Sequence, residues 1–144
     1  MFFFKATIVS GFFYAPCRSI QFKLVGITSD YRLNTQTCIM GSWDKTLKVW
    51  SISDLKCLES IKAHDDVINS LVACKGIVYS ASADGKIKAW GKHGNTSHSL
   101  QGILEGHKDV SLNSVTVSED GKWVYGGGSD EYGMGWEGNT NFSA

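Results

Sequence analysis

The ten residues ASADGKIKAW (Ala81–Trp90) decide the fold, because the chain carries two further segments built on the same pattern. These segments are GSWDKTLKVW (Gly41–Trp50) and GGSDEYGMGW (Gly127–Trp136). In each, an Asp stands six residues before a Trp, and the three Trp residues are spaced by 40 and then 46 positions. A period of this length is typical of repeat architectures, in which each unit stacks on its neighbours.

Within the middle period the sequence predicts four short strands. They are Val67–Cys74, Ile77–Ser82, Lys86–Trp90 and Leu100–Leu104. The dipeptide Asp84-Gly85 is a strong hairpin signal, and a Gly/Asn/Ser loop is expected over Gly91–Ser97. Strands recur in the same order on either side, at Thr46–Trp50, Lys56–Ile61, Ser114–Val117 and Lys122–Gly126. No window predicts a long amphipathic helix, so we expect an all-β fold.

The period, the Gly-His or Ala-His pair before the first strand, the Asp turn and the strand-ending Trp resemble WD40 repeats. The resemblance covers about Cys38 to Glu137, and Gly41–Ala73 is similar to plant WD40 proteins of the JINGUBANG type, regulators linked to pollen germination. It implies a partial WD40 β-propeller of about 2.5–3 four-stranded antiparallel blades that do not close a ring. It also implies a non-enzymatic scaffold for protein–protein interaction.

The expected organisation is three blades around residues 38–61, 64–104 and 107–137. Residues 1–37 form an N-terminal segment of unassigned structure, and residues 138–144 form a C-terminal tail. Closed propellers have about four to eight blades, so we expect a fragment or a truncated product, or a unit that self-associates through exposed blade edges. A truncated fragment without function is the alternative to a working scaffold.

The resemblance also implies a hydrogen-bonded tetrad in the middle blade, formed by His64, Ser80, Asp84 and Trp90. Asp accepts from its turn and from the His, the His bonds the hydroxyl, and the hydroxyl bonds the indole. The flanking blades carry partial signatures, namely Asp44 and Trp50 in the first and His107, Asp130 and Trp136 in the third. Met40 and Gly126 stand where a hydroxyl belongs.

A partner surface is expected at the turns. In WD40 proteins the residue before the turn Asp faces one side of the propeller, and here these residues are Trp43, Ala83 and Ser129. Exposed Trp is enriched at interface hot spots. We therefore expect Trp43, with Lys45 and Asp65, to contact a protein partner, or else Trp43 to pack under a neighbouring loop.

The search for catalytic chemistry gives no candidate. No GxSxG nucleophile elbow or phosphate-binding loop is present, and the GxGxxG match at Gly133–Gly138 lacks the strand-then-helix context of a dinucleotide site. His93 and His98 fall in one polar loop, where a solvated loop is favoured over a metal site. We expect no cofactor and no metal; a propeller-based hydrolase is the remaining enzymatic alternative.

Charge and cysteine content bound the remaining possibilities. Fourteen basic and fourteen acidic residues balance, which argues against a nucleic-acid or membrane binder and removes the repulsion that opposes self-association. Four cysteines form no CxxC pair, and we expect small buried thiols in a reducing compartment, with a disulfide as the alternative.

Lys5 interrupts the apolar start of the chain, so no targeting segment is expected. The expected location is cytoplasmic and/or nuclear.

Overall fold

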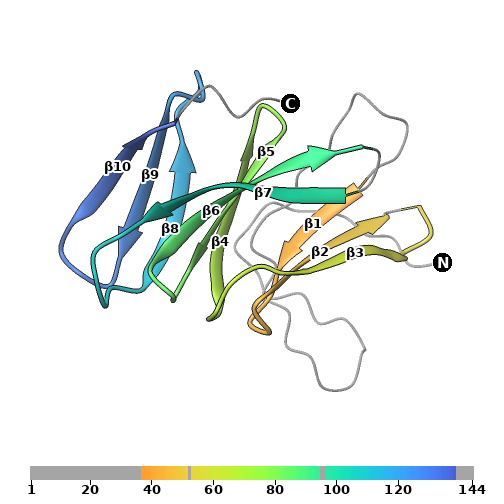
Figure 1. Ribbon diagram of the computed structural model, residues 1–144, viewed down its shortest axis with the longest axis horizontal. Coiled ribbons are helices and arrows are strands. Elements are labelled where there is room, and N and C mark those ends of the chain that lie inside the picture. Colours follow the sequence, from red (N-terminus) through yellow and green to blue (C-terminus); the bar gives the residue numbers. More distant parts are fainter. Residues whose placement is uncertain (1–36, 52, 95–96, 139–144) are drawn as a thin grey trace.

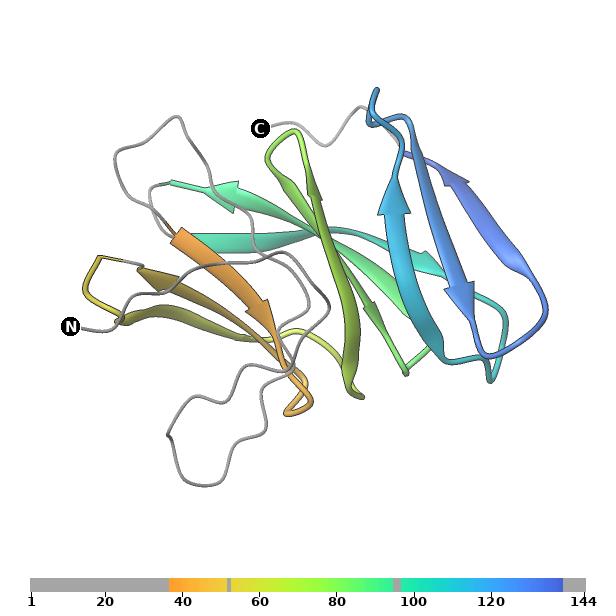
Figure 2. The same ribbon diagram turned by 180° about the vertical axis from the view of Figure 1, so that it is seen from behind.

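The computed structural model describes residues 37–51, 53–94 and 97–138, and in these ranges the chain forms three antiparallel sheets and no helix. Figure 1 shows the sheets in chain order, with the four-stranded sheet between two three-stranded ones. The view from behind confirms that β4 of the middle sheet lies beside β8 of the last sheet (Figure 2). We call the sheets blades one, two and three. The predicted class, an all-β partial propeller that does not close, is confirmed.

Blade two is a meander of four consecutive strands, each paired with the next. Its strands are β4 (Ile68–Cys74), β5 (Ile77–Ser82), β6 (Lys86–His93) and β7 (Ser97–Glu105). The β5–β6 hairpin turns at the predicted dipeptide, where Gly85 adopts a φ of +80°, a conformation that glycine reaches without the steric cost of a Cβ. Each of the four predicted strands is therefore present.

The flanking blades have three described strands each. Blade one consists of β1 (Thr37–Gly41), β2 (Thr46–Ser51) and β3 (Cys57–Lys62); blade three consists of β8 (Leu112–Val117), β9 (Trp123–Gly128) and β10 (Gly133–Glu137). Aligned on the repeated Trp, β1–β3 correspond to β5–β7, and β8–β10 correspond to β4–β6. The described residues thus hold one whole blade and two partial ones.

Two apolar layers hold the blades together, one on each face of blade two. Side chains of a strand alternate between its faces, so a blade has a forward face, toward its C-terminal neighbour, and a backward face, toward its N-terminal neighbour. The first layer joins the forward face of blade one to the backward face of blade two, through Ile39, Leu47, Val49, Ile68, Leu71, Val78 and Trp90. The second joins blades two and three in the same way, through Tyr79, Ala81, Ile87, Ala89, Leu112, Val115 and Val124.

Two sequence-based expectations are wrong. The predicted loop over Gly91–Ser97 is shorter, because β6 continues to His93 and β7 already begins at Ser97. The cysteines are not all buried: Cys38 is, but Cys57 lies exposed at the start of β3. Cys38, Cys57 and Cys74 are free thiols, whereas Cys17 lies outside the described residues. The N-terminal segment 1–36 and most of the tail also lie outside them.

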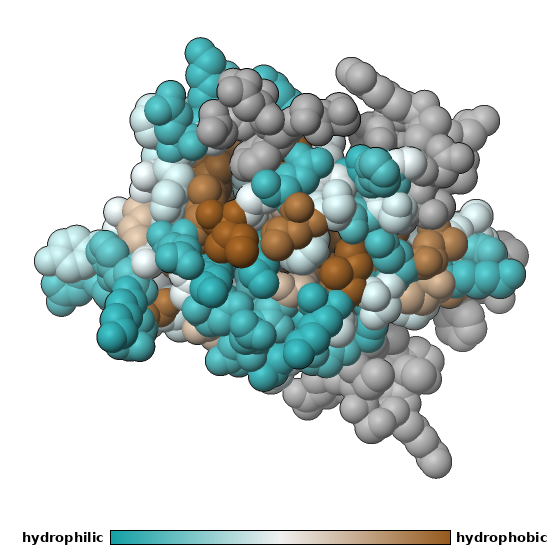
Figure 3. Space-filling view, viewed as in Figure 1, coloured by the Kyte–Doolittle hydropathy of each residue, from teal (hydrophilic) through white to brown (hydrophobic). Residues whose placement is uncertain are grey.

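The surface of the described residues is mixed in polarity. Figure 3 shows apolar groups within a largely hydrophilic surround on the face that β7 crosses. On β7 itself the exposed apolar side chains are Leu100 and Ile103. No helix in the described part of the chain is long and apolar enough to cross a membrane.

Candidate functional site

The four side chains expected to form the tetrad meet inside blade two. His64, from the connection that precedes β4, places Nδ1 2.8 Å from Asp84 Oδ2 and Nε2 2.8 Å from Ser80 Oγ. Trp90 Nε1 donates to the same Ser80 Oγ at 2.9 Å. His64 and Ser80 are almost completely buried. The tetrad thus joins the entry to the blade, β5, the β5–β6 turn and β6.

Proton positions in the tetrad follow from the pKa of His64. Burial lowers that pKa below its ordinary value, against the opposing effect of Asp84, so the ring is neutral at pH 7. A neutral ring has one N–H, which donates from Nδ1 to the Asp84 carboxylate. Nε2 then accepts the Ser80 hydroxyl proton, and the Ser80 oxygen accepts from the indole. Every buried polar atom in this chain of hydrogen bonds is satisfied, which rigidifies the blade.

Asp84 also organises its own turn. Its carboxylate accepts from the backbone N–H groups of Asp65, at 3.1 Å, and Lys86, at 3.0 Å. Partial burial acts to raise the pKa of Asp84, but the hydrogen bonds from His64 and these amides outweigh it and hold the pKa below its ordinary value. The hydroxyl of Ser82 donates to Asp66 O and accepts from Asp84 N, so Ser82 supports the turn rather than the tetrad.

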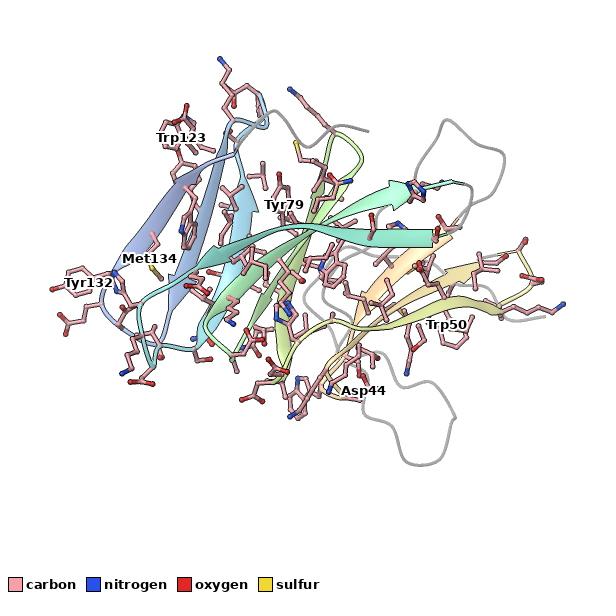
Figure 4. The ribbon with its side chains drawn as sticks, in the orientation of Figure 1. Asp44, Trp50, Tyr79, Trp123, Tyr132 and Met134 are labelled. Atoms are coloured by element: carbon pink, nitrogen blue, oxygen red, sulfur yellow. The ribbon has the colours of Figure 1, made fainter. Side chains whose placement is uncertain are left out.

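Of the hydrogen-bonded features of blade two, blade one has only the turn organised by an Asp. Partial burial acts to raise the pKa of Asp44, but hydrogen bonds from Thr46, Lys48 and Ser42 lower it to about 2. Met40 offers no hydroxyl, and Trp50 Nε1 is buried without a hydrogen-bond partner in the described part of the chain. Figure 4 shows Asp44 and Trp50 well apart on this blade.

Blade three has the His–Asp pair of the tetrad, but not the hydroxyl or its hydrogen bond to the Trp. His107 Nδ1 lies 2.9 Å from Asp130 Oδ2, but no hydroxyl stands at Gly126. The Trp136 indole donates instead to the backbone carbonyl of Glu105, at 3.2 Å. A Cβ on Gly126 would lie only 3.1 Å from the Trp136 ring, so this ring occupies the space that a hydroxyl would need.

Of the three expected contact residues, Trp43 and Lys45 lie in the β1–β2 turn of blade one and Asp65 lies in the connection that enters blade two. Trp43 is 44% exposed. Lys45 Nζ donates to the backbone carbonyl of Asp65 at 2.7 Å, which brings these two residues together. Of the other residues that precede a turn Asp, Ala83 is half-buried and Ser129 is exposed.

The turn that carries Trp43 is held on both sides. Ser42, next to it, is buried and accepts the amide of Asp44 on its hydroxyl at 3.1 Å. The carbonyl of Lys45 accepts from the amides of Ala63 and His64, at 3.0 and 3.2 Å, which ties the turn to the entry of blade two. Lys45 has a φ of +73°, where the equivalent residue in blade two is glycine. A lysine in this conformation is strained by about 1 kcal/mol, and strain of this kind clusters at functional sites.

The sequence also did not predict a contact between β3 of blade one and β7 of blade two. Glu59 on β3 accepts the backbone N–H of His98 on β7, at 3.0 Å to Oε1, and His98 Nδ1 lies 2.8 Å from Glu59 Oε2. His98 therefore lies in a strand and clamps blade two to blade one, whereas its expected place was a solvated loop. Neither residue belongs to the repeated pattern, so the sequence carried no signal for the pair.

The chemistry of these groups is structural. The His64 ring is enclosed, and its two nitrogens are occupied by Asp84 and Ser80, which leaves no free base for a substrate. No three His, Cys, Asp or Glu side chains in the described ranges are grouped so that they could hold a metal ion.

Stacked antiparallel sheets, each with a repeated Asp in one hairpin turn and a repeated Trp in the strand that follows, define this chain as a β-propeller repeat protein. The family model for the WD domain, G-beta repeat, matches residues 27–51, 55–91 and 98–133, more than half of the 144 residues. The chain therefore belongs to the WD40 repeat family.

Individual relatives share parts of this sequence. A WD repeat-containing protein of Schizosaccharomyces pombe is 26% identical over 88 residues, which cover 60% of this chain and 24% of the relative. A guanine nucleotide-binding protein subunit beta-like protein of Encephalitozoon cuniculi is 31% identical over 94 residues, covering 60% and 28%. A ubiquitin homeostasis protein of S. pombe is 41% identical over 113 residues, covering 53% and 16%. The chain thus spans between 16% and 28% of the length of these relatives.

Proposed function

We propose that this chain is a non-enzymatic protein-interaction scaffold, whose partner contacts Trp43 together with Lys45 and Asp65. The observation that carries the proposal is a large exposed indole on a turn that hydrogen bonds hold in place. Trp is the residue type most enriched at interface hot spots, and a preordered anchor loses little entropy on binding. Membership of the WD40 family supports the same role.

The strained backbone at Lys45 adds a second reason. A glycine at this position would remove the strain, as it does at Gly85 in blade two. Lysine provides, two residues from Trp43 in the same turn, an ammonium group that donates to the Asp65 carbonyl, and a partner with an acidic or carbonyl-rich surface would use it. The surface therefore offers one aromatic anchor and one cation.

A further part of the proposal concerns the group of WD40 proteins to which the chain belongs and the cellular compartment in which it acts. The stretch Gly41–Ala73, which resembles JINGUBANG-type proteins, carries the Trp43 turn and His64. On this basis we propose that the chain is a plant regulatory WD40 protein related to pollen germination, and that it acts in the cytoplasm and/or nucleus. Fluorescently tagged full-length chain in germinating pollen would test this, and exclusion from both compartments would contradict it.

Affinity capture with the parent chain, the Trp43→Ala variant and a control tests the contact surface. The control is Tyr132→Ala, which removes an aromatic side chain in blade three that is 67% exposed, compared with 44% for Trp43. We expect a set of proteins that the parent and the control recover and that Trp43→Ala loses. Titration calorimetry with a purified member of that set should then show affinity weakened about 30-fold or more. Equal recovery by all three chains contradicts the proposal.

Lys45→Gly separates binding from folding. Because it relieves the positive φ, we expect the folded state to be at least as stable as in the parent, while partner affinity falls. Circular dichroism during urea unfolding provides the stability readout. A non-functional truncated fragment would instead aggregate and show no cooperative transition.

A further inference from the structure

The connections at one end of the three blades form a continuous surface that begins at the Trp43 turn. They are the β1–β2, β5–β6 and β9–β10 turns and the β3–β4 and β7–β8 connections, along the lower side of Figure 1. Backbone hydrogen bonds join each of them to the next. The donor and acceptor pairs are Ala63 and Lys45, Ala83 and Val67, Gly106 and Gly85, and Ser129 and Ser111, at 2.9 to 3.0 Å. We call these five connections the turn surface.

The turn surface carries an excess of negative charge. Its acidic residues are Asp44, Asp65, Asp66, Asp84, Asp109, Asp130 and Glu131, and its basic residues are Lys45 and Lys108. At the opposite end of the blades the described connections are balanced, with Asp54, Glu119 and Asp120 against Lys56, Lys75 and Lys122. The zero net charge of the whole chain therefore hides a local acidic surface on the side of Trp43.

The carboxylates of Asp65 and Asp109 are free to bind a partner. Both residues are exposed, and within the described part of the chain neither side chain forms a hydrogen bond or an ion pair. They lie in the connections that enter blades two and three. At the opposite end, by contrast, Asp54 pairs with Lys56 at 3.6 Å. The turn surface thus offers charge that the described fold does not use.

The exposed indole of Trp43 suits the same chemistry. The face of an indole ring attracts an ammonium or guanidinium group, and Trp is the best of the aromatic side chains in this respect. Trp43 is 44% exposed and lies in the first connection of the turn surface. The indole and the free carboxylates are independent features, and Lys or Arg side chains of a partner satisfy both.

Lys45 is compatible with a basic partner. Its ammonium donates to the backbone carbonyl of Asp65 at 2.7 Å, so the Asp65 carboxylate stays available to other donors. An ammonium has three N–H groups, and those that remain can donate to the backbone carbonyls of a bound polypeptide. Of the two kinds of surface that suit Lys45, the charge around it therefore favours the carbonyl-rich one over the acidic one.

We propose that the partner binds the turn surface through a basic polypeptide segment, rich in Lys and Arg. One cationic side chain of the segment covers Trp43, and others pair with Asp65 and Asp109. The inference rests on the proposed function and adds the chemical class of the partner to it. Acidic and phosphate-bearing partners are repelled by the same charges.

Fluorescence anisotropy of labelled decalysine, with labelled decaglutamate for comparison, tests the proposal on the full chain. At about 50 mM NaCl we expect the parent to bind decalysine and not decaglutamate, with an affinity that falls as salt is added. D65N/D109N should raise the dissociation constant for decalysine at least about threefold. The matched control D54N/E119Q removes the same charge at the opposite end and should leave the dissociation constant unchanged.

Substitutions of Trp43 test the contact with the indole. Trp43→Leu keeps an apolar side chain but loses the ring, and should weaken decalysine binding about twofold or more. Trp43→Phe retains an aromatic face and should recover part of this loss. Circular dichroism should show the same fold in every variant, because the changed side chains are exposed.

Two results with the peptides would overturn the proposal. Equal binding of decalysine and decaglutamate would show that the surface does not select a basic segment. Equal weakening of decalysine binding by D65N/D109N and D54N/E119Q would show a response to total charge rather than to this surface.

Affinity capture with D65N/D109N separates the inference from the proposed function. Loss of the same proteins that Trp43→Ala loses supports the basic segment. Full recovery of those proteins by D65N/D109N would overturn the inference and leave the proposed function standing. If Trp43→Ala itself loses no protein, the proposed function is wrong, whatever decalysine does.

Discussion

Blade two and blade three contain nearly the same His–Asp pair, at 2.8 Å and 2.9 Å, and yet only one of them is buried. The side chain of His64 is 0% exposed and that of His107 is 54% exposed. The pair therefore forms without the tetrad, but it is enclosed only where a hydroxyl connects it to the Trp. One residue, Ser80 in blade two and Gly126 in blade three, marks the difference.

The largest difference in stability between the two blades should appear when the histidine of each is removed. His64→Ala removes the buried ring that joins the Ser80 hydroxyl to the Asp84 carboxylate and leaves a cavity in its place. We expect a loss of about 3 kcal/mol in the free energy of unfolding. His107→Ala removes a half-exposed ring and should change it by less than about 0.5 kcal/mol. Urea unfolding followed by circular dichroism measures both. Equal effects would show that the buried network adds nothing to the pair itself.

A smaller effect should follow when blade two is made to resemble blade three. Ser80→Ala removes the hydroxyl that joins His64 to Trp90, and we expect a loss of about 2 kcal/mol in the same measurement. The reverse change, Gly126→Ser, should give no gain, because the Trp136 ring fills the space and its indole already has an acceptor. A stabilised Gly126→Ser variant would contradict this account of blade three.

Acid should weaken blade two through His64. As the pH falls below 6.5 the unfolded chain binds a proton at this residue, whereas burial lowers the folded-state pKa and keeps the ring neutral. The unfolded state then binds more protons, so the free energy of unfolding decreases as the pH falls. Urea titrations from pH 8 to pH 5 should show this slope, and His107→Ala should retain it. A flat profile in the parent chain would contradict the neutral, buried His64.

The smallest expected effect concerns the glycines of β10. Gly133 has an ordinary negative-φ backbone and open space around it, so Gly133→Thr should stabilise blade three by about 0.5 kcal/mol. Urea unfolding followed by circular dichroism measures this change. No gain would mean that the glycines are not what weakens this strand.

The repeated pattern predicted the strands, because these depend on local alternation and on turn residues. The residues of the tetrad were implied by the resemblance to WD40 repeats. It did not predict contacts made by residues outside the pattern. Glu59 and His98 are 39 positions apart and belong to different blades, so only their placement on neighbouring outer strands brings them together. The new acceptor of Trp136, a backbone carbonyl, leaves no trace in the side-chain sequence either.

Within each sheet every strand pairs with the strand next to it in the chain, and this has a consequence for synthesis. Contacts between close neighbours form quickly, and chains fold as they leave the ribosome, N-terminal parts first. Blade two is complete once Glu105 has emerged, which is before the strands β8 to β10 of blade three emerge. Blade two can thus serve as a finished template, and the strands of blade three assemble on it as they appear.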